Sequence, residues 1–154
     1  MAHILLVEDS PEVSMTVREI LETAGHSIED APSGVEAMKL LKAGKFDAIV
    51  SDIWMPNMDG IALLKEIRGA GNDIPVVVIS GGAPNAPLTY TAPLAATFGA
   101  NVVIYKPFET SELLKAIETA QADNAHPVLI FEFAVAKGQS EFGRGSKIGN
   151  AYDL

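Results

Sequence analysis

The sequence predicts an α/β fold, a doubly wound, five-stranded parallel sheet with helices on both faces. Three apolar runs of strand length lack polar alternation, as strands buried on both faces do, and they lie at residues 4–7, 48–50 and 76–79. Helical hydrophobic patterns fill the intervals between these runs. Strands that alternate with helices form right-handed βαβ units, which build a parallel sheet.

Capping signals bound the first predicted helix. Apolar residues recur at helical spacing over residues 13–24, after Ser10 as N-cap and Pro11 at the first helical position. Gly25 is the stop signal of this helix.

A capping box begins the second predicted helix. Ser33 is followed three residues later by Glu36, and Gly44 ends the pattern. The apolar positions that we expect to face the core are Val35, Met38 and Leu41.

Two more helices follow the same logic. A helical apolar pattern covers residues 61–67 and stops near Gly69 or Gly71. The last helical pattern covers residues 113–120 and is capped near Thr110.

Two weaker strands and one irregular segment complete the predicted domain. Residues 26–29 are short and half polar, which indicates an edge strand, and residues 101–104 form the fifth strand. Three prolines interrupt residues 81–98, so we expect a long loop there, with a short helix from about Pro93 to Phe98.

The pattern changes after about residue 122. We therefore place one domain at residues 1–122 and a C-terminal tail at residues 123–154. Residues 128–135 are apolar and predict a strand, either docked on the edge of its own domain, which we favour, or used as a dimer element. Residues 137–154 are polar and glycine-rich, and the sequence leaves open whether they are native.

Composition excludes several classes of protein. The chain has 154 residues, enough for one domain and a tail, and no cysteine, which excludes disulfides, thiolate metal sites and thiol nucleophiles. Its formal net charge of −9 disfavours direct contact with nucleic-acid phosphates. The N-terminus is not a secretory signal, and no apolar stretch approaches the roughly 18 residues of a membrane span. We expect a cytoplasmic protein that binds neither membranes nor nucleic acid directly.

Polar residues stand where the predicted strands end. Glu8 and Asp9 end the first strand, Asp52 the third, Ser80 the fourth and Lys106 the fifth. The carboxyl ends of parallel strands meet at one edge of the sheet, where this class of fold binds ligands. The five side chains are therefore expected to form one site.

The residue types at this edge suit phosphoryl transfer. Three crowded carboxylates repel one another unless a cation lies among them, and hard oxygen ligands suit Mg²⁺, or Mn²⁺ in its place. Asp52 can act as a nucleophile and form an aspartyl phosphate, which Ser80 and Lys106 can then contact. The bond before Pro107 is expected to be trans, because only about 5–6% of such bonds are cis.

Together, these motifs resemble the receiver domain of two-component response regulators over residues 1 to about 121. They are Val7-Glu8-Asp9, the run from Asp52 to Gly60, Ser80, Gly99-Ala100 and Lys106-Pro107-Phe108. The resemblance implies the strand order 2-1-3-4-5 with five surrounding helices. It also implies that a histidine kinase or histidine phosphotransfer protein donates a phosphoryl group to Asp52.

The resemblance further implies a role for each site residue. Asp9 and Asp52 would bind Mg²⁺ directly, Glu8 through water, and Trp54 through its backbone carbonyl. Ser80 and Lys106 would contact the phosphoryl group and relay its arrival.

Three features depart from the family pattern. Val103 stands where the family often has an aromatic switch residue, and Tyr105 lies on the same face one pleat along, so we expect the signal to pass mainly through Ser80. The segment 81–98 is long and broken by prolines, and it is either a partner-binding feature or a tolerated insertion. Trp54 is bulky enough to shield the acyl phosphate, which predicts slow self-dephosphorylation.

The leading functional prediction is a stand-alone switch, monomeric or weakly dimeric, that changes its affinity for a protein partner when phosphorylated. We expect no enzymatic activity other than its own phosphorylation and its slow self-dephosphorylation. One alternative is the receiver half of a truncated DNA-binding regulator. Another is a Mg²⁺-dependent phosphohydrolase, which commonly has an Asp where this chain has Trp54. A degenerate receiver is disfavoured, because all five site residues are present.

Overall fold

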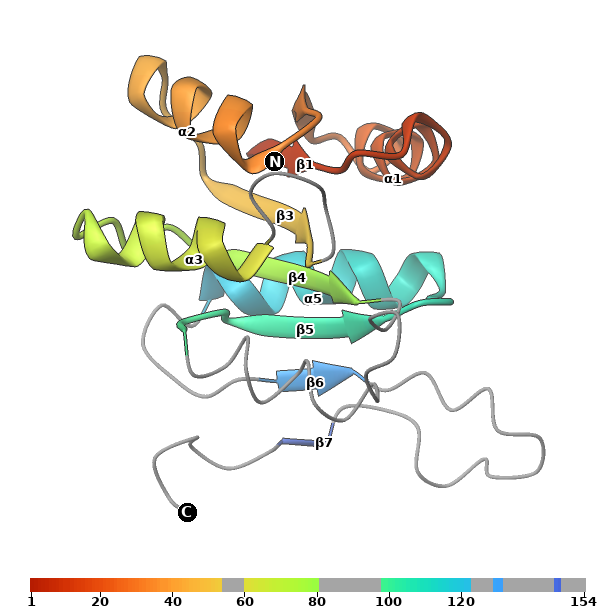
Figure 1. The fold of residues 1–154 in the computed structure, drawn as a ribbon. Coiled ribbons are helices and arrows are strands. Elements are labelled where there is room, and N and C mark those ends of the chain that lie inside the picture. The colour runs from red at the N-terminus through yellow and green to blue at the C-terminus, as the bar shows by residue number, and fades with distance from the viewer. Residues whose placement is uncertain (54–59, 81–97, 123–128, 132–145, 148–154) are drawn as a thin grey trace.

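The computed structural model describes residues 1–53, 60–80, 98–122, 129–131 and 146–147. The elements in chain order are β1 (His3–Val7), α1 (Pro11–Thr23), β2 (Ser27–Ala31), α2 (Gly34–Ala43), β3 (Ala48–Asp52), α3 (Gly60–Gly69), β4 (Val76–Ser80), β5 (Val102–Tyr105), α5 (Thr110–Ala122), β6 (Leu129–Phe131) and β7 (Ser146–Lys147) (Figure 1). The predicted short helix at 93–98 lies outside the described residues except for Phe98, which is in a turn.

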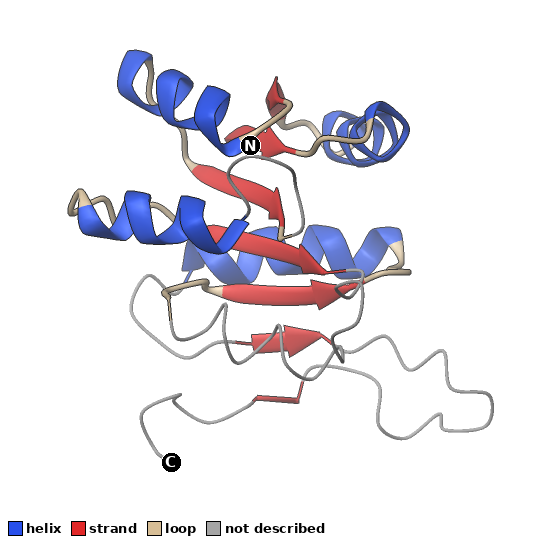
Figure 2. Ribbon diagram, viewed as in Figure 1, coloured by secondary structure: helices blue, strands red, loops and turns tan. Residues whose placement is uncertain are grey.

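All strands belong to one sheet with the order β2-β1-β3-β4-β5-β6-β7. The first five strands are parallel, which confirms the predicted doubly wound sheet and its order 2-1-3-4-5. Two further strands extend the sheet: β6 pairs with β5 in parallel, which agrees with the favoured docking of the tail strand on its own domain, and β7 pairs with β6 in antiparallel orientation. Figure 2 shows the added strands beyond β5.

Helices cover both faces of this sheet (Figure 2). Strand residues alternate between two buried clusters, so that Leu5 and Val7 face one side while Ile4 and Leu6 face the other. Side chains of α2 and α3 complete the first cluster. Side chains of α1 and α5 complete the second cluster. Two apolar layers therefore hold the strands in register, and the strand ends are left free for polar residues.

The capping predictions agree with the structure. The Ser10 hydroxyl accepts from the Val13 amide at 3.4 Å, and the Ser33 hydroxyl accepts from the Glu36 amide at 3.3 Å. Gly25, just beyond α1, has a φ of 98°, a left-handed conformation that a side chain would oppose.

Two expectations were wrong. Val35 is 43% exposed, because the line of α2 that faces the core passes through Gly34 and Ala37, which are both buried. The helical period places Val35 one step to the side of that line.

The second expectation concerned the peptide bond before Pro107. The Lys106–Pro107 peptide bond is cis, not trans.

The tail strand lies inside the predicted range 128–135. The described part, β6, pairs with β5 of its own chain, with Val103 opposite Ile130, and residues 132–135 lie outside the described residues. Among the described helices, none is long and apolar enough to cross a membrane.

Arg68 joins three segments at the amino ends of the strands. From the end of α3 its guanidinium donates to the backbone oxygens of Ile74 at 2.7 Å and Gly99 at 2.8 Å. It also donates to the Asn72 oxygen and to Oδ1 of Asn101. Burial lowers the pKa of Arg68. These bonds tie α3 to the start of β4 and to the turn that precedes β5.

Candidate functional site

Three carboxylates meet at the carboxyl edge of the sheet. Glu8 and Asp9 follow β1, and Asp52 is the last residue of β3. One oxygen from each of the three residues lies within 4.8 Å of the other two. Glu8 and Asp52 are 6% and 7% exposed, whereas Asp9 is exposed. The cluster is therefore a half-buried acidic pocket with one open side.

Lys106 completes this cluster from the end of β5. Its Nζ lies 3.4 Å from Oδ2 of Asp52 and 3.9 Å from Oε2 of Glu8. A buried carboxylate is costly unless it is paired, so the lysine offsets part of the charge that the pocket concentrates.

The start of α1 holds Glu8 in place. The Glu8 amide donates to the Ala31 oxygen at 3.0 Å, which extends the pairing of β1 with β2 by one residue. Its Oε1 accepts from the Ser10 amide at 3.1 Å. Glu8 therefore uses one carboxylate oxygen to order the helix start and turns the other toward Lys106.

The pocket disfavours ionised Glu8. Burial, and then the charge of Asp52, raise the pKa of Glu8 from 4.5 to about 7, although the Ser10 amide and Lys106 act in the opposite direction. A divalent cation bound here would reverse this effect, because it favours the ionised carboxylate.

The donor set fits a hard divalent cation. Mg²⁺ takes oxygen ligands, keeps several waters and is commonly held by one or two carboxylates. The oxygens of Glu8, Asp9 and Asp52 are close enough to serve one ion, and Asp9 is exposed to solvent, which can supply water ligands.

The remaining predicted residues lie on the neighbouring strands or outside the described chain. The backbone of Ser80 ends β4, in register with Tyr105 of β5. Val103 and Tyr105 are both buried in the cluster that includes α2 and α3, on one face of β5. Trp54 lies outside the described residues.

Two residues that contact the backbone carbonyl group of Asp52 were assigned no role of their own from the sequence. The Ser51 hydroxyl donates to the Asp52 backbone oxygen at 2.8 Å, and Gly60 packs directly against the same carbonyl group. Each of the two residues has a weak signal in the sequence. Ser51 is a polar residue directly after the apolar run 48–50, and Gly60 directly precedes the third helical pattern.

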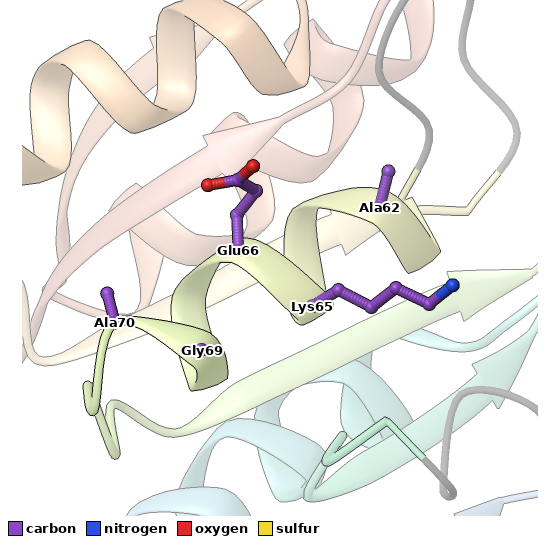
Figure 3. A pocket seen from close by; sticks show the side chains of 5 residues that line it. All are labelled: Ala62, Lys65, Glu66, Gly69 and Ala70. Carbon is purple, nitrogen blue, oxygen red and sulfur yellow. The ribbon is translucent and has the colours of Figure 1, made fainter.

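A separate hollow on α3 lacks comparable chemistry. It has a volume of about 550 Å³ and is lined by Ala62, Lys65, Glu66, Gly69 and Ala70 (Figure 3). The Lys65 Nζ lies 4.4 Å from the centre of the Phe98 ring. No group of metal ligands among the described residues includes a residue of this hollow, so we do not treat it as a site.

Comparison with known proteins decides the family. Residues 4–118 match the response regulator receiver domain. The chain belongs to that family. Among its relatives, sensor kinase CckA of Brucella abortus is 37% identical over 119 residues, which are 76% of this chain and 12% of that protein. Response regulator MprA of Mycobacterium tuberculosis is 37% identical over 112 residues, which are 73% of this chain and 47% of that protein.

Solved receiver structures share the fold. The receiver domain of NtrX from Brucella abortus has a TM-score of 0.70 at 33% identity, and the match covers 77% of this chain and 98% of that one. The chain spans about half the length of MprA and a smaller share of CckA. It therefore contains a receiver domain of two-component signalling, a signalling domain that these relatives carry within longer proteins.

Proposed function

We propose that the receiver domain is a switch operated by phosphorylation of Asp52. The observation that carries the proposal is the convergence of Glu8, Asp9, Asp52 and Lys106 at the ends of separate strands. A histidine kinase or a histidine phosphotransfer protein is the donor, since the relatives include a sensor kinase and a response regulator.

The reaction needs a positioned carboxylate and compensation of negative charge. An oxygen of Asp52 attacks phosphorus, the bond between phosphorus and the donor nitrogen breaks, and that nitrogen leaves with its electron pair and is protonated. Lys106 lies 3.4 Å from Asp52 and can transfer its contact from the carboxylate to a phosphoryl oxygen. Ser80 follows the neighbouring strand and is the proposed second contact, through its hydroxyl.

The proposed cofactor is Mg²⁺, with Mn²⁺ as a substitute. Glu8, Asp9 and Asp52 would hold it, together with the Trp54 carbonyl, and Glu8 would act through water. When bound, the ion supplies positive charge to the phosphoryl oxygens. Ser80, Val103 and Tyr105 are the proposed switch residues, and an unidentified protein is the output partner.

The nature of the phosphoryl bond tests this proposal. The full chain is incubated with acetyl phosphate and Mg²⁺, and its intact mass is measured before and after treatment with hydroxylamine, which cleaves acyl phosphates. We expect one phosphoryl group that hydroxylamine removes and that Asp52→Asn does not acquire. A phosphoryl group that resists hydroxylamine, or one that Asp52→Asn still takes up, would overturn the proposal.

The receiver part of a longer DNA-binding regulator is a second candidate, because the match covers only 47% of MprA. It predicts that the protein in its native cells is longer than this chain and binds a DNA fragment when phosphorylated. An immunoblot of cell extract that shows only a protein of about this chain's mass, 16.3 kDa, would contradict it.

A further inference from the structure

Ser51 is a buried polar residue next to the phosphoacceptor. It is 2% exposed and lies on the face of β3 that also presents Ile49 to the apolar cluster with α2 and α3, a cluster that Ile53, just beyond the strand, joins as well. A hydroxyl in such a layer needs a partner, and the Ser51 Oγ donates to the Asp52 backbone oxygen at 2.8 Å. An alanine side chain would occupy nearly the same volume at position 51. The hydroxyl and its hydrogen bond are therefore what serine adds at this position.

Gly60 approaches the same carbonyl group from the start of α3. A Cβ atom on Gly60 would lie 2.4 Å from the Asp52 oxygen and 2.8 Å from the Ile53 Cα. Both neighbours are backbone atoms, so a side chain here would force the strand end or the helix start to move. The Gly60 amide also donates to the Ile53 oxygen at 2.7 Å.

These contacts fix the peptide that joins Asp52 to Ile53. Its oxygen is held by Ser51 and lies against Gly60, and its nitrogen, that of Ile53, donates to the Ile79 oxygen at 3.3 Å. The aspartate side chain has only two rotatable bonds, so its carboxylate follows any displacement of its backbone. That carboxylate lies close to the oxygens of Glu8 and Asp9 and also pairs with Lys106, so a small displacement would disturb both arrangements.

We propose that Ser51 and Gly60 are positioning residues that clamp the Asp52 peptide and so hold its carboxylate for metal binding and attack on phosphorus. This inference rests on the proposed function. Misplacement of a reacting group by about 1 Å can cost roughly 100-fold in rate. Loss of the Ser51 hydroxyl should therefore lower the rate of phosphorylation clearly, while the thermal midpoint of unfolding changes little.

The test compares three variants of the full chain, Ser51→Ala, Ser51→Thr and Ile49→Val. Ser51→Thr keeps the hydroxyl. Ile49→Val is the matched control, because it removes one methylene group from the same face of the same strand. For each protein we would measure the thermal midpoint, the Mg²⁺ dissociation constant from the fluorescence of the single tryptophan, and the maximal rate of phosphorylation by acetyl phosphate.

We expect Ser51→Ala to lower the maximal rate about tenfold and to weaken Mg²⁺ binding about fivefold, while the donor concentration at half-maximal rate stays near that of the wild type. Ser51→Thr should recover most of the rate, and Ile49→Val should keep it. A Ser51→Ala rate within about twofold of the wild type, or an equal loss in Ile49→Val, would overturn the clamp.

Gly60→Ala should lower the rate further, although this variant can fail to fold, and the Ser51 series does not depend on it. If the wild type takes up no phosphoryl group, the proposed function fails. The clamp is then still decided by the Mg²⁺ dissociation constants of Ser51→Ala and Ile49→Val, and equal constants overturn it.

Discussion

The Lys106 Nζ lies 3.4 Å from Oδ2 of Asp52, although the two residues lie at the ends of strands that are not neighbours. Lys106 follows β5 and Asp52 ends β3, and β4 lies between them in the sheet. The lysine therefore reaches across the end of β4, whose last residue is Ser80. A group added to Oδ2 of Asp52 would therefore lie next to the lysine ammonium group.

Removal of the Lys106 charge should have opposite effects on metal binding and on phosphorylation. We expect Lys106→Met to bind Mg²⁺ several-fold more tightly, because the ammonium group repels a cation held by Asp52 and Glu8. Phosphorylation should be at least about tenfold slower, because a charge that stabilises the phosphoryl oxygens is lost. Titration calorimetry and intact-mass kinetics measure the two effects.

Lys65→Met is the matched control, since Lys65 lies on α3 beside Phe98 and not in the acidic cluster. Weaker Mg²⁺ binding in Lys106→Met would contradict the repulsion argument.

The metal-free domain should lose stability as the pH rises. The pKa of Glu8 is raised to about 7 in the fold from 4.5, so folding favours the protonated form. The resulting contribution is complete below about pH 4.5 and is lost as the pH rises through about 7. At about 1.4 kcal/mol per pKa unit, the loss is on the order of 3 kcal/mol.

Glu8→Gln cannot ionise and should lack this part of the pH dependence. Urea unfolding in the presence of a chelator, at about pH 5 and about pH 8, gives the difference between wild type and variant. Identical pH dependence of the two proteins would show that Glu8 is not the titrating group. Mg²⁺ should stabilise the wild type more at the higher pH.

Arg68 should be important for stability and unimportant for the acidic site. Arg68→Met leaves the backbone oxygens of Ile74 and Gly99 without their donor, which should cost about 2–4 kcal/mol in the free energy of unfolding. Mg²⁺ affinity should stay within about twofold of the wild type, because these bonds lie at the opposite edge of the sheet.

Arg18→Met is the control for loss of an arginine. Arg18 is 40% exposed in its ion pairs with Glu22 and Asp30, and such surface pairs contribute about 1 kcal/mol or less. Equal destabilisation by the two variants would contradict the role given to Arg68.

The tail strand should protect the edge of β5 within a single chain. β6 pairs with Val102, Val103 and Ile104, so Ile130→Pro should disturb this pairing and accelerate hydrogen exchange of β5 amides by about tenfold or more. Ile130→Val serves as the control. Light scattering should give the mass of one chain for the wild type. A dimer that becomes a monomer when the chain is ended at Ala122 would show that the strand pairs between chains instead.

The helix caps and the acidic cluster could be predicted from the sequence, because each depends on signals that are local in the chain. Ser10 and Ser33 were identified as caps because an N-cap is a local relation between a side chain and an amide three residues on. The convergence of Glu8, Asp9 and Asp52 followed from strand ends alone. Val35 was misplaced because three apolar residues fit more than one helical stripe, and only packing against the sheet selects Ala37.

Other features depend on contacts between distant segments. The sequence left two alternatives for the tail strand, docking on its own domain or pairing with a second chain. The pairing of β6 with β5 is the first of these, and an apolar run alone does not determine which strand it pairs with. The roles of Ser51 and Gly60 could not be predicted, because they depend on where the Asp52 carbonyl group points.

We propose that one divalent ion, held by Glu8, Asp9 and Asp52, allows Asp52 to take a phosphoryl group. The most direct measurement is the fraction of phosphorylated chain, from intact mass, as Mg²⁺ is titrated at a fixed concentration of acetyl phosphate. We expect negligible modification in chelator, a rise that follows the occupancy of one Mg²⁺ per chain, and a shift of this curve to higher Mg²⁺ in Asp9→Asn. Full modification in chelator, or an Asp9→Asn curve that coincides with that of the wild type, would contradict it.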